Sequence, residues 1–292
     1  PTVTQVKVTK KWDDANNQDG LRPKEIRVQL YAGDQKLGKE VVLSADNKWT
    51  HTFEKLAEKA NGQAIHYSVK EVNVPEGYTV TEESKEKGDV VLTNTHTPST
   101  VDIPVTKIWV DNDNQDGLRP AKITVNLYAN GEKVAHKDIT SETDWRETFT
   151  GLPEFKDGKK IVYTLQEEKV ENYSPSIDQE SYTITNTHTP GKTTLSVTKQ
   201  WDDQEDKDGL RPKSVKVQLY ADGKKSGDVI ELSAENKWTH TFADLDKNVK
   251  GKAITYTVEE VDVPTGYQVT KTDDGQGNVV LTNKPVSYTH LT

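Results

Sequence analysis

A stretch of 25 residues occurs three times along this chain, and it constrains the fold more than any other feature of the sequence. Each copy begins with VTKxW, continues through an acidic loop ending in DGLRP and closes on LYA; the copies are Val8–Ala32, Val105–Ala129 and Val197–Ala221. Their tryptophans are spaced by 97 and 92 residues. A period of about 95 residues can hold one sandwich-sized core and is too long for a solenoid repeat. The sequence therefore predicts three domains in series, which we call units one, two and three.

Short alternations of apolar and polar residues fill each unit, separated by Gly, Asn, Asp and Pro, which is typical of strands joined by tight turns. In unit one we expect strands at 4–12, 26–30, 40–43, 49–53, 65–72, 78–81 and 90–94. Units two and three repeat the order, with strands at 103–109, 123–128, 145–149, 161–167 and 182–186, and at 195–201, 215–220, 238–242, 254–260 and 279–283. Only residues 56–60 suggest one or two helical turns. The expected fold class is all-β.

The composition argues against disorder and gives no sign of a nucleic-acid or membrane partner. Hydrophobic residues make up 32% and charged residues 29%, but 11 Tyr and 6 Trp indicate a folded chain with a strongly solvated surface. The net charge of −9 comes from interleaved acids and bases, without a basic patch that would bind nucleic acid or anionic lipid. No run approaches the roughly 20 apolar residues of a membrane span.

The chain contains no cysteine and no methionine. Small β domains outside the cell often depend on disulfides, so an extracellular chain of this kind would need another staple. Because neither a signal peptide nor a sorting motif is present, and the initiator methionine is missing, we interpret the sequence as part of a longer protein. The tail 285–292 breaks the repeat and looks like a translated sequencing adapter, so we exclude it from the fold prediction as non-native.

Short connectors join the units. Eight residues separate the last expected strand of one unit from the first of the next, THTPSTVD and THTPGKTT, each with one proline and no run of Gly and Ser. Linkers of this length and composition hold neighbouring domains close together. We therefore expect an extended, semi-rigid rod of three domains at 1–98, 99–190 and 191–284.

Three polar residues recur at positions where the strand alternation points toward the core. The lysines are Lys10, Lys107 and Lys199, the glutamates are Glu71, Glu167 and Glu260, and the asparagines are Asn94, Asn186 and Asn283. The lysine-to-glutamate spacings are 61, 60 and 61 residues, and the glutamate-to-asparagine spacings are 23, 19 and 23. Unit two keeps the triplet although its loop after the glutamate is shorter. Lys11 lies on the opposite face of its strand, so we expect an ordinary surface charge there.

Burying a lysine and a glutamate together is costly unless the two are paired or neutral. Burial lowers the pKa of an amine and raises that of a carboxyl, so both can be neutral near pH 7. A neutral amine is a nucleophile, and a protonated carboxyl can polarise an amide carbonyl and relay the proton. Beside an asparagine, the product would be a Lys–Asn isopeptide bond with loss of ammonia. The alternative is a core cluster held by hydrogen bonds alone, or lysines that reach water at a strand edge.

Other candidate sites are weaker. The loops DDANNQDG, DNDNQDG and DDQEDKDG resemble a calcium loop, but the twelfth position is Ile26, Ile123 or Val215 instead of glutamate. We interpret them as solvated acidic turns, with the following arginines, Arg22, Arg119 and Arg211, paired to those acids. The seven histidines lack metal-binding spacing, and no repeated nucleophile site or phosphate-binding loop is present. We expect no cofactor, no metal and no turnover enzyme.

The motifs VTKxW, DGLRPxxIxVxLY, WTHTF, YTVEE and LTNTHTP resemble the Cna protein B-type domain, a repeat of Gram-positive collagen adhesins, and the resemblance covers residues 2–284. It implies an immunoglobulin-like, transthyretin-like β-sandwich in which a first-strand lysine is joined to a last-strand asparagine with help from a buried acid. The lysine falls on Lys10, Lys107 and Lys199, the asparagine on Asn94, Asn186 and Asn283, and the acid on Glu71, Glu167 and Glu260. Glu167 and Glu260 belong to Glu–Glu doublets, in which strand parity favours them over Glu168 and Glu259.

The resemblance implies a structural stalk in a virulence-associated adhesin anchored to the bacterial cell wall. In such a protein a separate N-terminal region binds a host matrix protein such as collagen, and a C-terminal signal anchors the chain; neither region lies in this sequence. We expect a monomer whose neighbours are further adhesin domains of the same chain. The alternative is a binding module, in which the domains themselves contact the host matrix protein.

Overall fold

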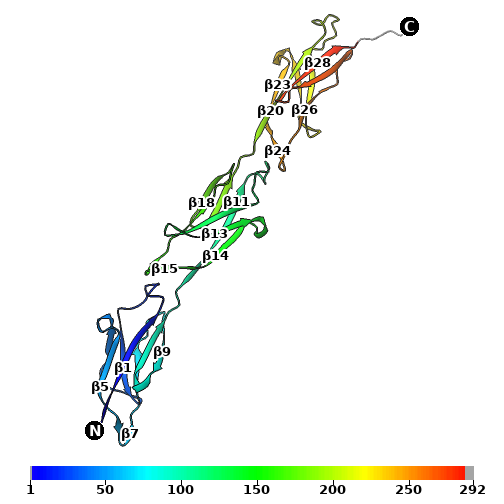
Figure 1. Cartoon of the computed structure of the whole chain (residues 1–292). Helices are drawn as coiled ribbons and strands as arrows, with labels where there is room; N and C mark the ends of the chain where they lie inside the picture. Colours follow the sequence, from blue (N-terminus) through cyan, green and yellow to red (C-terminus); the bar gives the residue numbers. More distant parts are fainter. Residues whose placement is uncertain (1, 287–292) are drawn as a thin grey trace.

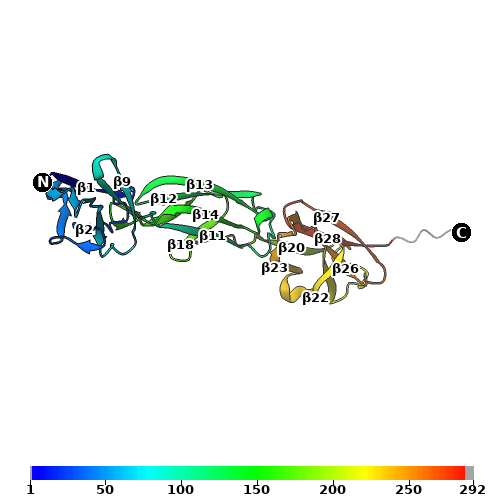
Figure 2. The same cartoon turned by 90° about the horizontal axis from the view of Figure 1, so that it is seen from below.

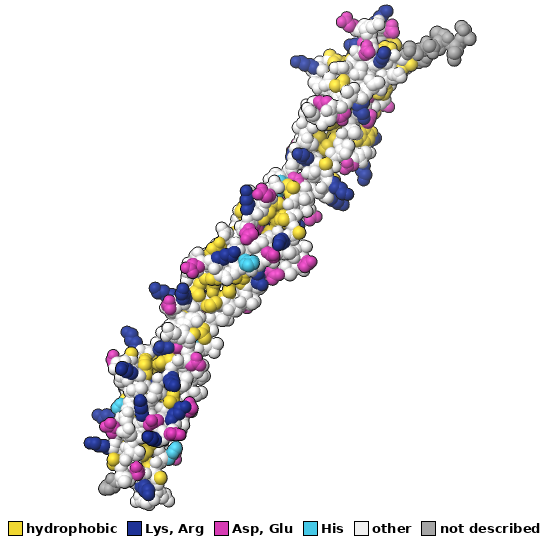
Figure 3. All heavy atoms as spheres, viewed as in Figure 1, with side chains coloured by type: hydrophobic (Ala, Val, Ile, Leu, Met, Phe, Trp, Pro, Cys, Tyr) yellow, Lys and Arg dark blue, Asp and Glu magenta, His cyan; other side chains and the backbone are white. Residues whose placement is uncertain are grey.

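The computed structural model describes residues 2–286 and consists of three β units arranged end to end in an extended rod (Figures 1 and 2). Each unit has its own hydrophobic core, and the three clusters of buried residues have no member in common. The described residues contain no α-helix; four one-turn 3-10 helices lie at Ala45–Asn47, Glu86–Gly88, Ser141–Thr143 and Ala234–Asn236. Lysines, arginines and acids are interspersed along the face shown in Figure 3. The expected all-β rod of three sandwich domains is confirmed.

Two sheets face each other in each unit. Unit one contains β1 (Val3–Asp13), β2 (Glu25–Ala32), β3 (Gln35–Lys36), β4 (Val41–Ser44), β5 (Thr50–Ala57), β6 (Lys59–Ala60), β7 (Gln63–Ala64), β8 (Tyr67–Val72), β9 (Thr79–Ser84) and β10 (Val90–Thr95). The first sheet has the order β5-β1-β10-β9, and the second is built on β2, which pairs with β3, β4 and β8. β6 and β7 form a separate hairpin.

Units two and three repeat this plan. Unit two contains β11 (Thr100–Val110), β12 (Lys122–Ala129), β13 (Glu132–Thr140), β14 (Arg146–Pro153), β15 (Phe155–Lys156), β16 (Lys159–Lys160), β17 (Tyr163–Glu167), β18 (Ser174–Asp178) and β19 (Thr183–Thr187). Unit three contains β20 (Lys192–Trp201), β21 (Ser214–Ala221), β22 (Lys224–Ser233), β23 (Thr239–Asp246), β24 (Asn248–Val249), β25 (Lys252–Ala253), β26 (Tyr256–Val261), β27 (Tyr267–Asp273) and β28 (Asn278–Pro285). Their first sheets have the orders β14-β11-β19-β18 and β23-β20-β28-β27.

The first and last strands of every unit lie side by side and run parallel in the middle of the first sheet. In unit one, β1 pairs with β10 so that Lys10 is opposite Leu92 and Trp12 is opposite Asn94. β1 also pairs antiparallel with β5 on its other side. Parallel strands need a long crossover, which here is the rest of the unit. The fold therefore brings the two ends of each unit's sequence together in one core-facing surface.

The helical turns suggested for residues 56–60 are wrong. β5 continues as a strand to Ala57, and Leu56 is buried against the core and paired with Thr4 of β1. The register shifts between Thr4 and Val6, and Lys55 adopts a positive φ of 55°. This β-bulge interrupts the alternation by one residue, which gives the sequence its apparent helical period.

The prediction of a non-native tail at 285–292 falls largely outside the described residues. Within them, Pro285 belongs to β28 and lies opposite Tyr267, and the Val286 amide donates to the Gly266 carbonyl.

Candidate functional site

The structure brings the lysine, glutamate and asparagine of unit one together between the two sheets. Lys10 lies on β1 and Asn94 on the adjacent β10, offset by two residues and on the same face. Glu71 lies on β8 of the second sheet, opposite Val28 of β2, and its carboxyl faces the first sheet. Lys10 is 3% exposed and Asn94 is fully buried, so both side chains are shielded from bulk solvent. Lys11, on the other face, is exposed as expected.

The Glu71 carboxyl bridges the other two groups. Its Oε1 lies 3.4 Å from the Lys10 Nζ, and its Oε2 accepts a hydrogen bond of 2.8 Å from the Asn94 Nδ2. The lysine Nζ also donates to the carbonyls of Lys11 and Leu92 at 3.2 and 3.4 Å. Glu71 Oε1 and Asn94 Oδ1 have no hydrogen-bond partner among residues 2–286. Buried polar atoms are nearly always hydrogen-bonded, so this pair of atoms marks an incompletely satisfied site.

Units two and three place their triplets in the same way. The Lys107 Nζ lies 3.4 Å from Glu167 Oε2, and the Lys199 Nζ lies 3.7 Å from Glu260 Oε1. In unit three the Asn283 Nδ2 donates to Glu260 Oε2 at 2.8 Å, as in unit one. Unit two differs, because neither Nδ2 nor Oδ1 of the buried Asn186 has a hydrogen-bond partner in the described part of the chain. All three triplets thus leave polar atoms of the asparagine amide unsatisfied in the core.

Burial makes the three amines easier to deprotonate. Loss of solvation lowers the pKa of Lys10, Lys107 and Lys199 to about 8 each, and the attraction of the paired glutamate opposes this effect only in part. At pH 7 about a tenth of each amine would be neutral. Each Nζ lies over the ring of the tryptophan two residues later, at 4.6, 4.1 and 4.4 Å from the centroid. A tryptophan face stabilises the charged amine and holds it in position.

The two Glu–Glu doublets are divided between the core and the surface. The side chains of Glu167 and Glu260 are 2% and 0% exposed, and each faces its lysine. Glu168 is exposed, and Glu259 forms a surface ion pair with Lys271 at 2.5 Å. This is the arrangement that strand parity predicts.

The prediction of solvated acidic turns is wrong for one aspartate in each loop, Asp14, Asp111 and Asp203, and for Asp19, all of which are buried; most other residues of the three loops are exposed or half-buried. Asp14 and Asp19 of the first loop are only 2% and 7% exposed. Asp14 accepts hydrogen bonds from Arg22 Nε and Nη2 at 3.1 and 2.6 Å, and from the Tyr78 hydroxyl at 2.6 Å. These donors hold the pKa of Asp14 at about 2 despite burial, which by itself would raise it. The predicted pairing of the arginines with the loop acids is confirmed in all three units.

Sequence reasoning predicted the aspartate–arginine pairs of this second polar cluster, but it missed their burial and the tyrosine. The same acid, arginine and tyrosine meet in the other units as Asp111–Arg119–Tyr173 and Asp203–Arg211–Tyr267. The signal was available, because DGLRP and a tyrosine near the last strands are repeated in all three units. Since the carboxylate, the guanidinium and the hydroxyl satisfy one another, the arrangement braces the loop and leaves no free ligand group.

Within residues 2–286 no three His, Cys, Asp or Glu side chains are grouped so that they could hold a metal ion. The same residues include no helix with the length and apolar character required to cross a bilayer.

Comparison with known proteins identifies the repeats. The model of the Cna protein B-type domain matches residues 6–95, 103–187 and 195–284. A collagen adhesin of Staphylococcus aureus is 47% identical over 284 residues, which are 97% of this chain and 24% of that relative. The solved structure of two B repeat units of the Staphylococcus aureus collagen binding protein is 46% identical, with a TM-score of 0.60, and the match covers 98% of this chain and 76% of that one. The chain therefore belongs to the Cna protein B-type domain family, of which it carries three tandem copies.

Proposed function

We propose that this chain is part of the stalk of a cell-wall-anchored bacterial surface adhesin, and that a Lys–Asn isopeptide bond closes each domain. The observation that carries the proposal is the Glu71 carboxyl, which in a closed core lies within reach of both the Lys10 Nζ and the Asn94 amide. The lysine–glutamate contact recurs in each domain, and the glutamate–asparagine hydrogen bond recurs in unit three. The similarity to a collagen adhesin supports the stalk, because this chain corresponds to 24% of that relative and matches repeat units of it.

The reaction needs one proton on the Lys10–Glu71 pair. In the reactive form the amine is neutral and the carboxyl carries the proton. The Lys10 Nζ attacks the Cγ of Asn94, and the protonated carboxyl donates a hydrogen bond to Oδ1, where negative charge develops. Glu71 then carries a proton from the attacking nitrogen to the leaving Nδ2. A new C–N amide bond forms, the old C–N bond breaks, and one ammonia leaves.

The position of the bond suits a chain under tension. The parallel first and last strands of each domain carry its two termini, so a pull along the rod loads these two strands directly. A covalent bond between them would transmit the force without unfolding the domain. It would also stabilise each domain by about 4.5 kcal/mol, the loop-entropy value for a closed loop of roughly 80 residues. In this cysteine-free chain the bond would replace a disulfide staple.

Single-molecule pulling tests the mechanical role. The unaltered chain should show no domain unfolding at forces that unfold ordinary sandwich domains. Lys10→Ala should release one domain, with a gain in length of about 300 Å for roughly 90 residues. The matched control is Lys11→Ala, because Lys11 is the next residue on the opposite, exposed face. Unfolding of all three domains in the unaltered chain would refute the proposal.

Host binding is assigned to regions of the adhesin outside this chain, by analogy with the relative, which is named for collagen. The opposing proposal is that the domains themselves bind a host matrix protein. Solid-phase binding of this chain to immobilised collagen separates the two. Saturable binding would contradict a pure spacer, whereas the stalk proposal predicts none.

A further inference from the structure

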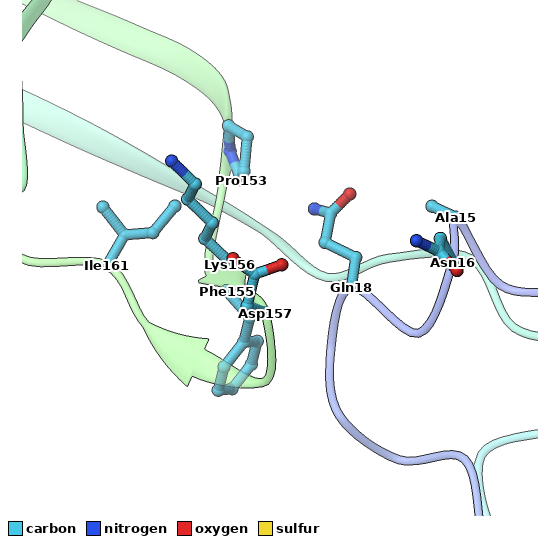
Figure 4. A pocket seen from close by; sticks show the side chains of 8 residues that line it. All are labelled: Ala15, Asn16, Gln18, Pro153, Phe155, Lys156, Asp157 and Ile161. Atoms are coloured by element: carbon cyan, nitrogen blue, oxygen red, sulfur yellow. The ribbon is translucent and has the colours of Figure 1, made fainter.

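Consecutive domains touch through glycines. At the first junction, Gly20 of the Asp–Gly loop of unit one lies against Gly158 in the β15–β16 hairpin of unit two, and the Gly158 amide donates to the Gln18 carbonyl at 3.0 Å. At the second junction, Gly117 lies against Gly251 in the β24–β25 hairpin, whose amide donates to the Gln115 carbonyl at 2.9 Å. Figure 4 shows the first junction, with Gln18 of the loop opposite Asp157 of the hairpin. Loop and hairpin therefore form a repeated joint.

The contact leaves no room for a side chain. A Cβ on Gly20 would lie 2.6 Å from the Gly158 Cα, and one on Gly117 would lie 2.8 Å from the Gly251 Cα. Beside the first contact, a cavity of about 310 Å³ separates Ala15 and Asn16 from the hairpin. The two glycines and the single backbone hydrogen bond are thus the tight part of the joint, and they set the approach of the two domains.

A polar latch joins the loop to the connector at each junction. Asp19 Oδ2 accepts from the Ser99 amide at 2.8 Å and lies 2.7 Å from the His96 Nε2. At the second junction, Asp116 Oδ2 accepts from the Gly191 amide at 2.8 Å and lies 2.7 Å from the His188 Nε2. The second junction adds bonds from Gln115 Nε2 to the Asn248 carbonyl and from Asn248 Nδ2 to Asp116 Oδ1.

The two parts of this joint, the glycine hairpin and the Asp–Gly loop, also occur without a docked partner at the two ends of the rod, as the hairpin of unit one and the loop of unit three. The hairpin of unit one has the same turn as the other two, with positive φ at both central residues: Asn61 and Gly62 (52° and 78°), Asp157 and Gly158 (51° and 77°), and Lys250 and Gly251 (49° and 78°). At the other end, Gly209 has the φ of Gly117, 70°, and its loop is braced by the Asp203–Arg211 pair. Apart from the glycine and its two chain neighbours, no atom of the described residues lies within 4 Å of a Cβ on Gly62 or Gly209.

We propose that the β6–β7 hairpin and the loop at residues 203–211 are docking surfaces for further domains of the same class. The Asn61–Gly62 turn would receive the Asp–Gly loop of a preceding domain. The loop around Gly209 would receive the glycine-containing hairpin of a following one. The argument is continuity with two junctions that share the glycine contact and the backbone hydrogen bond. Because that contact uses main-chain atoms, it does not require a glutamine at the position of Gln18 and Gln115, where unit three has Lys207. The joint does not depend on the isopeptide bond.

Amide hydrogen exchange of three matched glycines tests the joint in the chain as it exists. The Gly158 and Gly251 amides should exchange at least about tenfold more slowly than the Gly62 amide, which occupies the same turn without a docked loop. Equal exchange of the three would show that the joint does not form in solution and would overturn the proposal.

A four-domain chain tests the open end. Residues 95–190 are appended after Asn283, so that a second copy of unit two follows the Gly209 loop. The amide of the added copy's hairpin glycine should become protected as Gly158 is, and Gly209→Ala should remove that protection while Gly158 and Gly251 keep theirs. If Gly209→Ala unfolds unit three, the test rests on the unsubstituted four-domain chain, in which the amide of the added copy's hairpin glycine should be protected from exchange. Absence of protection there would refute the docking surface.

Discussion

Replacing Glu260 by glutamine tests the role of the acid while the lysine and the asparagine of the site stay unchanged. Glutamine keeps the size of the side chain, but it cannot shuttle the proton between the lysine amine and the leaving ammonia. We therefore expect the Lys199–Asn283 bond of unit three to be absent while the other two bonds form. The closed loop spans 84 residues, and its loss should lower the free energy of unfolding of unit three by about 4.5 kcal/mol. With a urea m value of about 1–2 kcal/mol/M, the unfolding midpoint should fall by about 2.3–4.5 M.

Glu259→Gln is the matched control for this experiment. Glu259 is the preceding residue of the same strand, but its carboxylate pairs with Lys271 at the surface. An exposed ion pair contributes at most about 1 kcal/mol, so the control should keep all three bonds and nearly all of its stability. Intact mass spectrometry counts the ammonia lost, and fragment spectra of a digest locate the cross-linked peptides. Loss of three ammonia molecules from Glu260→Gln would refute the role of the acid, as would loss of only two from Glu259→Gln.

Three further predictions follow from the buried and interdomain polar groups. In newly synthesised chains the rate of bond formation in unit one, followed by mass, should fall as pH rises through about 8, because the reactive pair holds one proton and the Lys10 pKa of about 8 marks the loss of that proton. A rate that rises through pH 8 would show that a neutral amine suffices. Arg22→Ala removes two hydrogen bonds from the buried Asp14 and should destabilise unit one by about 2–3 kcal/mol in urea titrations; no change would contradict the bracing role. The hydrogen bond that the His96 Nε2–H donates to the Asp19 carboxylate raises the pKa of His96 above its usual 6.5, so the latch should be fully stabilising below pH 6.5 and weaken as pH rises through the raised value. Spin-label distances between units one and two should broaden accordingly, and His96→Gln should remove this dependence on pH.

Strand parity explains why much of the site could be predicted from the sequence. Because successive side chains of a strand point to opposite faces, the alternation around Lys10 and Asn94 places both on the core side, and it distinguishes Glu260 from Glu259. The same rule failed at residues 54–57, where the bulge at Lys55 shifts the parity by one residue. A single extra residue in one strand leaves no reliable mark in the sequence pattern.

The joints between domains could not be predicted in the same way. Glycine at position 20 is sufficiently explained by a turn with φ > 0, so its second role, the contact with Gly158, appears only when two domains are placed together. The acids of the loop resembled surface charges because composition does not reveal donors that arrive from distant strands, such as the Tyr78 hydroxyl on Asp14.

The intact mass of the folded, purified chain tests the central claim most directly. If each domain closes its own Lys–Asn bond, the mass should fall below the value calculated from the sequence by three ammonia molecules, one for each of the pairs Lys10–Asn94, Lys107–Asn186 and Lys199–Asn283. A folded chain with the full calculated mass would contradict the account, because the three triplets would then be hydrogen-bonded core clusters and nothing more.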